Sequence, residues 1–129
     1  MRFMIIVKAT AKSEAAGMPR ASLLAELGAF HEELARAGVL LDGAGLKASA
    51  QSWRVATDAS GQRSVEDSPD TQASERIAGY ALIQVRSREE AVEWARRYPT
   101  PASHGSTRHI EVRPLCEAED FVRRAEGEL

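Results

Sequence analysis

The chain has 129 residues, 43% of them hydrophobic and 28% charged, and a formal net charge of −2 at pH 7. This length predicts a single domain over residues 1–129, and the charge argues against a nucleic-acid partner, which needs a clustered basic surface. One cysteine, Cys116, excludes an internal disulfide. Neither a signal peptide nor an apolar run of roughly 20 residues is present, so we expect a cytoplasmic protein without a membrane partner.

The N-terminal third predicts a strand followed by a long helix. Residues 3–8 are a continuous apolar run rich in β-branched side chains, typical of a central strand that is apolar on both faces. Residues 10–17 are small and polar and predict a loop. Leucines and a phenylalanine at helical spacing predict a helix over residues 20–37, with Pro19 in its first turn and Gly38 as its C-terminal cap.

The middle of the chain predicts a second strand and a hairpin. Residues 39–41 begin the strand, and the Asp-Gly step at Asp42 predicts a break or a bulge. Residues 53–57 and 63–65 predict the two strands of the hairpin, joined by a turn at residues 58–61.

A buried strand and a capped helix follow. Residues 67–75 predict a polar loop, and residues 77–86 predict a strongly buried strand. Ser87 is expected to cap a helix that ends at Tyr98, with Glu90 as its capping-box partner.

The C-terminal part predicts a last strand and a short helix. Residues 107–113 alternate, so that Ile110 and Val112 share one face while His109, Glu111 and Arg113 share the other. Residues 117–126 predict a helix. Its apolar positions are expected to point inward: Ala118, Phe121, Val122 and Ala125.

This order of elements predicts a ferredoxin-like α+β domain. Its antiparallel sheet would carry helices on one face, with an extra short C-terminal helix. The first strand is apolar on both sides, so the uncovered face of the sheet needs a second layer. We therefore expect a homodimer in which two open sheet faces pack together.

Several short segments carry a family resemblance through their order and spacing. They are Ala37 to Leu41, Gly43 to Leu46, Asp67 to Asp70, Ile77 to Tyr80, Glu89 to Ala95, Ile110 to Pro114, and Glu117 to Phe121. Taken together they resemble the YCII-related family, in its DGPF-type branch. The resemblance implies a dimeric α+β barrel in a small cytoplasmic bacterial protein of unknown role. Some relatives are fused to or encoded near extracytoplasmic-function sigma factors, and a more distant branch is thought to use a His–Asp pair.

The chain departs from the branch at the positions that define it. Ser68 stands where the branch has glycine, and Asp70 stands where it has phenylalanine. Ala44 replaces the acid that the branch places between two glycines. A ligand that relatives hold through these positions would meet altered side chains here.

His31 and Asp42 are the candidate catalytic residues. His31 falls at the edge of the apolar stripe of its helix, and Asp42 follows in the strand that returns antiparallel to that helix, at a similar height. A histidine oriented by a carboxylate is a general-base arrangement. The alternative is a boundary histidine with one hydrogen bond and an aspartate that serves its own turn.

Four residues are candidate ligand contacts: Tyr80, His109, Glu111 and Arg113. The last three would suit a pocket wall inside a dimer, and equally a solvated face or a ladder of ion pairs. Tyr80 could instead belong to the core or an interface. We expect no cofactor and no metal, since His31, His104 and His109 lack ligand spacing.

Two functions follow from these features. The first is a non-enzymatic dimeric module that binds a small molecule or a protein partner in a regulatory setting. The second is a small acid–base enzyme with His31 as base and Asp42 as the residue that orients it.

Overall fold

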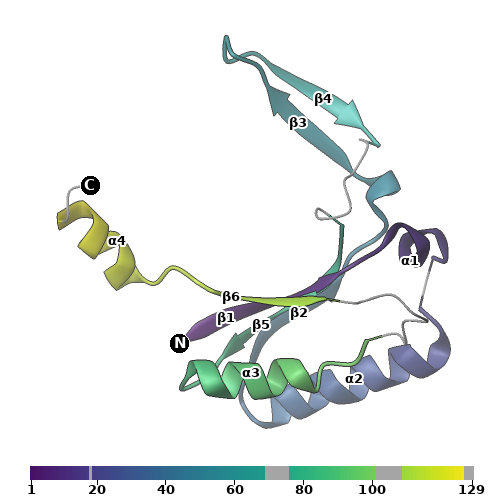
Figure 1. The fold of residues 1–129 in the computed structure, drawn as a ribbon, viewed down its shortest axis with the longest axis vertical. Coiled ribbons are helices and arrows are strands. Elements are labelled where there is room, and N and C mark those ends of the chain that lie inside the picture. Colours follow the sequence, from purple (N-terminus) through teal and green to yellow (C-terminus); the bar gives the residue numbers. More distant parts are fainter. Residues whose placement is uncertain (18, 69–75, 101–108, 127–129) are drawn as a thin grey trace.

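The computed structural model describes residues 1–17, 19–68, 76–100 and 109–126, and only the backbone from residue 123 onward. Four antiparallel strands form one sheet in the order β2-β5-β1-β6. They are β1 (Arg2–Lys8), β2 (Leu40–Gly45), β5 (Ile77–Gln84) and β6 (Ile110–Pro114). Helices α2 (Ala21–Arg36) and α3 (Arg88–Arg96) cover one face (Figure 1). The predicted ferredoxin-like α+β fold is confirmed.

The core lies between β1, β5 and the two helices. Ile5, Leu34 and Ile83 have no exposed surface. Phe3 and Ile5 face the helices, because they pair with Ile83 and Ala81 of β5, which are also buried. Alternate residues of β1 therefore point to the other face, which the helices leave open.

The ends of α2 and α3 form largely as their cap residues predict. Gly38 follows α2 with φ +74°, a left-handed conformation that glycine adopts without steric penalty. The Ser87 hydroxyl accepts from the Glu90 backbone N–H at 3.1 Å. The Glu90 carboxylate accepts from the backbone N–H of Arg86 at 3.0 Å rather than from that of Ser87.

The predicted loop over residues 10–17 is wrong, because the segment contains helix α1 (Ala11–Ala15). The Thr10 hydroxyl accepts from the Ser13 N–H at 3.0 Å, and the Ser13 hydroxyl accepts from the Thr10 N–H at 2.9 Å. Short polar side chains favour helix caps as well as loops, which explains the error. Pro19 lies before the N-cap Arg20, and so outside the first turn of α2.

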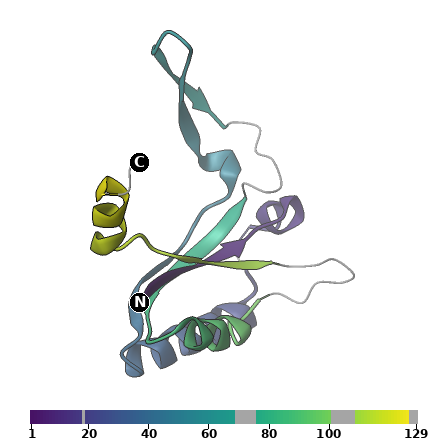
Figure 2. The same cartoon turned by 60° about the vertical axis from the view of Figure 1, so that its left-hand side comes forward.

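The hairpin is confirmed as β3 (Trp53–Thr57) and β4 (Arg63–Asp67), a separate two-stranded sheet. Within its turn, one Asp58 carboxylate oxygen accepts from the backbone N–H groups of Ser60 and Gln62, each at 2.9 Å. Figures 1 and 2 show the hairpin rising from the side of the sheet opposite α2 and α3.

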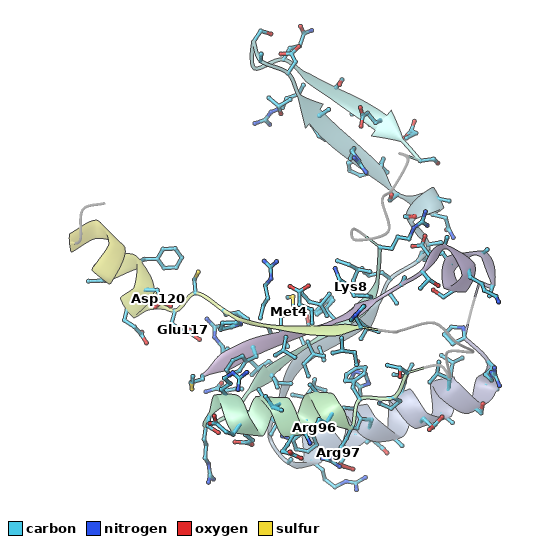
Figure 3. All side chains as sticks on the ribbon, viewed as in Figure 1. Met4, Lys8, Arg96, Arg97, Glu117 and Asp120 are labelled. Atoms are coloured by element: carbon cyan, nitrogen blue, oxygen red, sulfur yellow. The ribbon has the colours of Figure 1, made fainter. Side chains whose placement is uncertain are left out.

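Helix α4 (Ala118–Glu126) forms, but the expectation that Ala118, Phe121 and Val122 point inward is wrong, and the side chain of Ala125 lies outside the described part. Phe121 is 63% exposed and Val122 58% exposed. The start of the helix is held by charged contacts instead. Arg2 donates to the Glu117 carboxylate from Nε and Nη2 at 2.8–3.2 Å, and the Glu117 N–H donates to Asp120 at 2.7 Å (Figure 3). Apolar periodicity identifies a face but not what covers it.

The loop predicted over residues 67–75 is described only at its start. Ser68 has φ +46°, and its hydroxyl donates to the Ala50 carbonyl at 2.7 Å. Ser68 thus holds a left-handed backbone conformation that glycine adopts more readily than other residues. Asp70 and His104 lie outside the described residues.

A polar cluster ties α1 to the base of the hairpin. The Glu14 carboxylate accepts from the N–H and hydroxyl of Ser49, at 3.0 and 2.7 Å, and forms an ion pair with Arg76. Ser49 begins a 3₁₀ turn, η1 (Ser49–Gln51), that leads into β3. Burial alone would raise the pKa of Glu14, but the Ser49 hydrogen bonds and the Arg76 charge outweigh it and lower that pKa.

We expect Glu14→Gln to lower the free energy of unfolding by about 1–3 kcal/mol near neutral pH, measured by urea denaturation. The folded pKa of Glu14 lies below its unfolded pKa, so the unfolded chain binds more protons. The stabilisation is therefore present above the unfolded pKa and is lost as pH falls through the folded one. The gap between wild type and variant should shrink as the pH falls below the ordinary glutamate pKa of about 4.3.

Glu66→Gln is the matched control. Glu66 lies 3.9 Å from Arg54, with both side chains well exposed, and such a pair contributes at most about 1 kcal/mol. Equal losses in the two variants would contradict a structural role for the Glu14 cluster.

Candidate functional site

His31 lies half-buried on α2, with a partner at each ring nitrogen. Its Nδ1 is 2.8 Å from the Leu27 carbonyl oxygen, and its Nε2 is 3.0 Å from the Tyr98 hydroxyl. A carbonyl can only accept, so the neutral ring carries its proton on Nδ1, and Nε2 accepts from Tyr98.

Aromatic rings and a glycine set the position of the His31 ring. Tyr98 is buried two residues after the end of α3, and its ring centroid lies 5.6 Å from that of His31 and 5.1 Å from that of Phe30. Burial raises the pKa of Tyr98. A Cβ added at Gly43 would lie 3.4 Å from His31 Cδ2 and Nε2, so glycine lets the ring approach β2 closely.

Asp42 has a different partner. Its carboxylate accepts from the Tyr80 hydroxyl at 3.0 Å, and this hydrogen bond raises the pKa of Tyr80. A bulge in β2 explains the direction of Asp42. Leu40 pairs with Ile83, whereas Asp42 pairs with Leu82, so the shift turns Asp42 toward the open face.

The structure therefore does not bring His31 and Asp42 together. His31 lies on the helix-covered side of β2, against Gly43, and Asp42 lies on the opposite side. The groups that orient His31 are the Leu27 carbonyl and Tyr98. The sequence predicts Tyr98 as the last residue of its helix, and no spacing signal links it to a histidine 67 residues away. The catalytic roles of His31 and Asp42 stay a prediction.

Three of the four candidate ligand contacts share the open face of the sheet. Tyr80 and Glu111 each pair with Ile6 of β1, from opposite sides. Arg113, two residues after Glu111 in β6, pairs with Met4, two residues before Ile6 in β1. Cross-strand partners project from the same face, so these polar side chains surround an apolar stripe.

Ion pairs organise the β6 edge of this face. Arg113 Nε donates to Glu111 at 2.7 Å, and Lys8 Nζ lies 3.7 Å from the other Glu111 oxygen. The Arg113 hydrogen bond, with both positive charges, outweighs desolvation and lowers the pKa of Glu111. Figure 3 shows Lys8 and Met4 on the side of the sheet away from the helices. His109 is exposed just before β6, and its carbonyl accepts from the Lys8 N–H at 3.3 Å.

An apolar cavity of about 280 Å³ lies on the helix side, between α3 and β6. Its lining residues are Met1, Phe3, Arg88, Ala91, Val92, Val112 and Pro114. None of the predicted site residues contributes to this lining, so the cavity and the polar open face are separate features.

Within the described part of the chain, no three histidine, cysteine or carboxylate residues form a group that could hold a metal ion. No helix among the same residues has the length and apolar character needed to cross a membrane.

Fold and surface together define a ferredoxin-like α+β protein with one sheet face open and bordered by polar side chains. The model of the YCII-related domain matches residues 1–116, and the chain belongs to this family. No curated protein matches the chain.

We expect Tyr98→Phe to remove the donor to His31 Nε2 while keeping the ring that packs on Phe30. The free energy of unfolding should fall by about 1 kcal/mol, because one hydrogen bond is lost. Nitrogen NMR of the histidine ring should show the proton on Nδ1 in both proteins, with only the Nε2 resonance shifted by the substitution. A proton found on Nε2 in the wild type would contradict this arrangement.

Proposed function

We propose that this protein is a homodimeric, non-catalytic module that binds a small molecule or a protein partner in a regulatory role. The observation that carries the proposal is the open sheet face, where an apolar stripe lies among polar groups. The ligand would lie between the open faces of two copies.

The apolar stripe supports dimerisation. Met4, Ile6 and Leu82 lie at its centre, half-buried although none of the described helices covers them. Contiguous apolar surface of this kind is typical of an interface, and a self-complementary patch favours a twofold dimer.

The polar border supports ligand binding. Arg113 is 73% exposed, and its contact with Glu111 uses Nε, so other guanidinium N–H groups face outward. Tyr80, already bonded to Asp42, can still accept a hydrogen bond. His109 lies just before the first residue of β6, the strand that carries Arg113. A second copy above these groups would exclude water and strengthen their polar contacts with a ligand.

The second candidate function is an acid–base enzyme that uses His31. A half-buried histidine held by two hydrogen bonds favours it. The Asp42 carboxylate is bonded to Tyr80, so the Leu27 carbonyl, which accepts from Nδ1, takes the place of the orienting group in this version. His31 could act as a base only after Tyr98 releases Nε2, and that requirement ranks the enzyme second.

Assignment to the DGPF-type branch belongs to the same proposal. The left-handed backbone at Ser68, where that branch has glycine, supports it. The free cysteine Cys116, which is exposed, fits the cytoplasmic location that we propose.

We expect the wild-type protein to sediment as a dimer at micromolar concentration. Ile6→Glu should produce a monomer, because it buries a charge in the proposed interface. Leu24→Glu is the matched control, since Leu24 is 41% exposed on α2, away from the open face. A monomeric wild type, or equal behaviour of the two variants, would rule out this interface.

We expect a thermal-shift screen of small polar compounds to find a ligand that raises the melting temperature. Arg113→Gln and Tyr80→Phe should each reduce the shift, whereas Arg54→Gln on the hairpin should not. A shift lost only in His31→Ala would favour the enzyme, and a shift insensitive to all of these variants would place the ligand elsewhere.

A further inference from the structure

The β3–β4 hairpin and α4 both leave large apolar side chains in solvent. On the hairpin, Trp53 is 66% exposed, Val55 51% and Val65 65%. On α4, Phe121 is 63% exposed and Val122 58%. Side chains of this kind usually lose much of their exposure in a folded protein, so each element requires a covering surface.

Neither element is stable without such a surface. A lone two-stranded hairpin is marginal in water, and so is an isolated helix as short as the nine residues of α4. The hairpin and α4 are both rooted in the domain by polar contacts, at Glu14 with Ser49 and at Arg2 with Glu117. Those contacts fix where each element begins and leave its apolar face open.

The apolar side chains of the hairpin share one face. Val55 pairs directly with Val65, and Trp53 lies two residues before Val55, so the three project together. Arg63 lies two residues before Val65 and borders the same face. We call this surface, made of Trp53, Val55 and Val65, the hairpin patch.

The charges next to the two surfaces are complementary at one end of the hairpin patch. Arg63 borders the patch beside Val65, whereas Asp67 pairs with Trp53 at the other end. On α4, Glu119 lies three residues before Val122, one turn away on the same side. Within the described residues, neither Arg63 nor Glu119 forms an ion pair. A cation beside one apolar surface and an anion beside the other favour contact between the two.

The arrangement in space points to a second copy as the source of that contact. Figures 1 and 2 show the hairpin and α4 rising on the same open side of the sheet but over different ends of it. Consider a twofold axis that is parallel to the open face and perpendicular to the line between its two ends. This axis exchanges the ends and so brings α4 of each copy toward the hairpin of the other.

We propose that α4 of each protomer in a dimer covers the hairpin patch of the other protomer. We call this reciprocal contact the clasp. Phe121 and Val122 pack on the patch, and Glu119 pairs with the opposing Arg63. This clasp rests on the dimer proposed above and adds a second, separate interface to it.

Cysteine cross-linking tests the clasp. The variant to be tested is the full chain with Val65→Cys and Val122→Cys, in which Cys116→Ser removes the native thiol. This variant is treated with a mild oxidant. We expect a disulfide-linked dimer on a non-reducing gel, reversed by reductant. The control pair Leu24→Cys with Val122→Cys should give no covalent dimer, since Leu24 lies on α2.

The other outcomes overturn the clasp in distinguishable ways. A monomer with an internal disulfide would show that α4 covers the hairpin of its own chain. No disulfide in a protein that sediments as a dimer would reject the clasp and leave the sheet-face dimer standing. A protein that is monomeric before oxidation and forms no link would reject both.

Charge reversal tests the ion pair independently of cysteine chemistry. Arg63→Glu or Glu119→Arg alone should weaken the dimer about two- to thirtyfold by sedimentation, because each dimer contains two such exposed pairs and both are lost. The double variant should restore the wild-type dissociation constant, since the pair re-forms with exchanged signs. Additive losses in the double variant would contradict the pairing.

Discussion

The antiparallel pairing of β1 with β5 on one side and β6 on the other is the interaction on which the rest of the structure depends. Side chains alternate along each strand, so this register decides which residues meet the helices and which lie on the open face. It places Ile5 in the core, and Met4 and Ile6 opposite. A shift by one residue would exchange these sets and bury Lys8, Glu111 and Arg113 under α2 and α3.

The same alternation separates the two residues that the sequence pairs as a catalytic dyad. The distances of His31 and Asp42 from the turn between α2 and β2 could be estimated from helix and strand dimensions. These distances are similar, which suggested that the two residues lie side by side. The direction of Asp42 could not be predicted, because the Asp-Gly step indicates a break or a bulge without saying which, and the bulge found between Leu40 and Asp42 inverts the pattern by one residue. Without the bulge, Asp42 would share the face of Leu40 and point toward α2. With it, Gly43 faces His31 and Asp42 bonds to Tyr80.

Most of the fold could be predicted because its signals are local. Apolar runs define β1 and β5, periodicity defines α2, and Ser87 and Gly38 mark helix ends. Helix α1 was missed because the Thr10 and Ser13 cap is equally typical of a loop. The Tyr98 partner of His31 and the exposure of Phe121 depend on contacts between distant segments, or on their absence, which a single sequence does not encode locally.

The placement of both helices on one face has a consequence for the elements outside the sheet. The hairpin is inserted between β2 and β5, and α4 follows β6, and both rise on the side that α2 and α3 leave free. Their bases are held by ion pairs, Glu14 with Arg76 and Arg2 with Glu117, which are directional and fix an angle. Their faces are apolar, and apolar contact is non-directional and needs only matching area. Each element therefore has directional contacts at its base and exposed apolar side chains beyond it. The apolar stripe through Ile6 lies between these two elements, so a single second copy would cover all three surfaces at once.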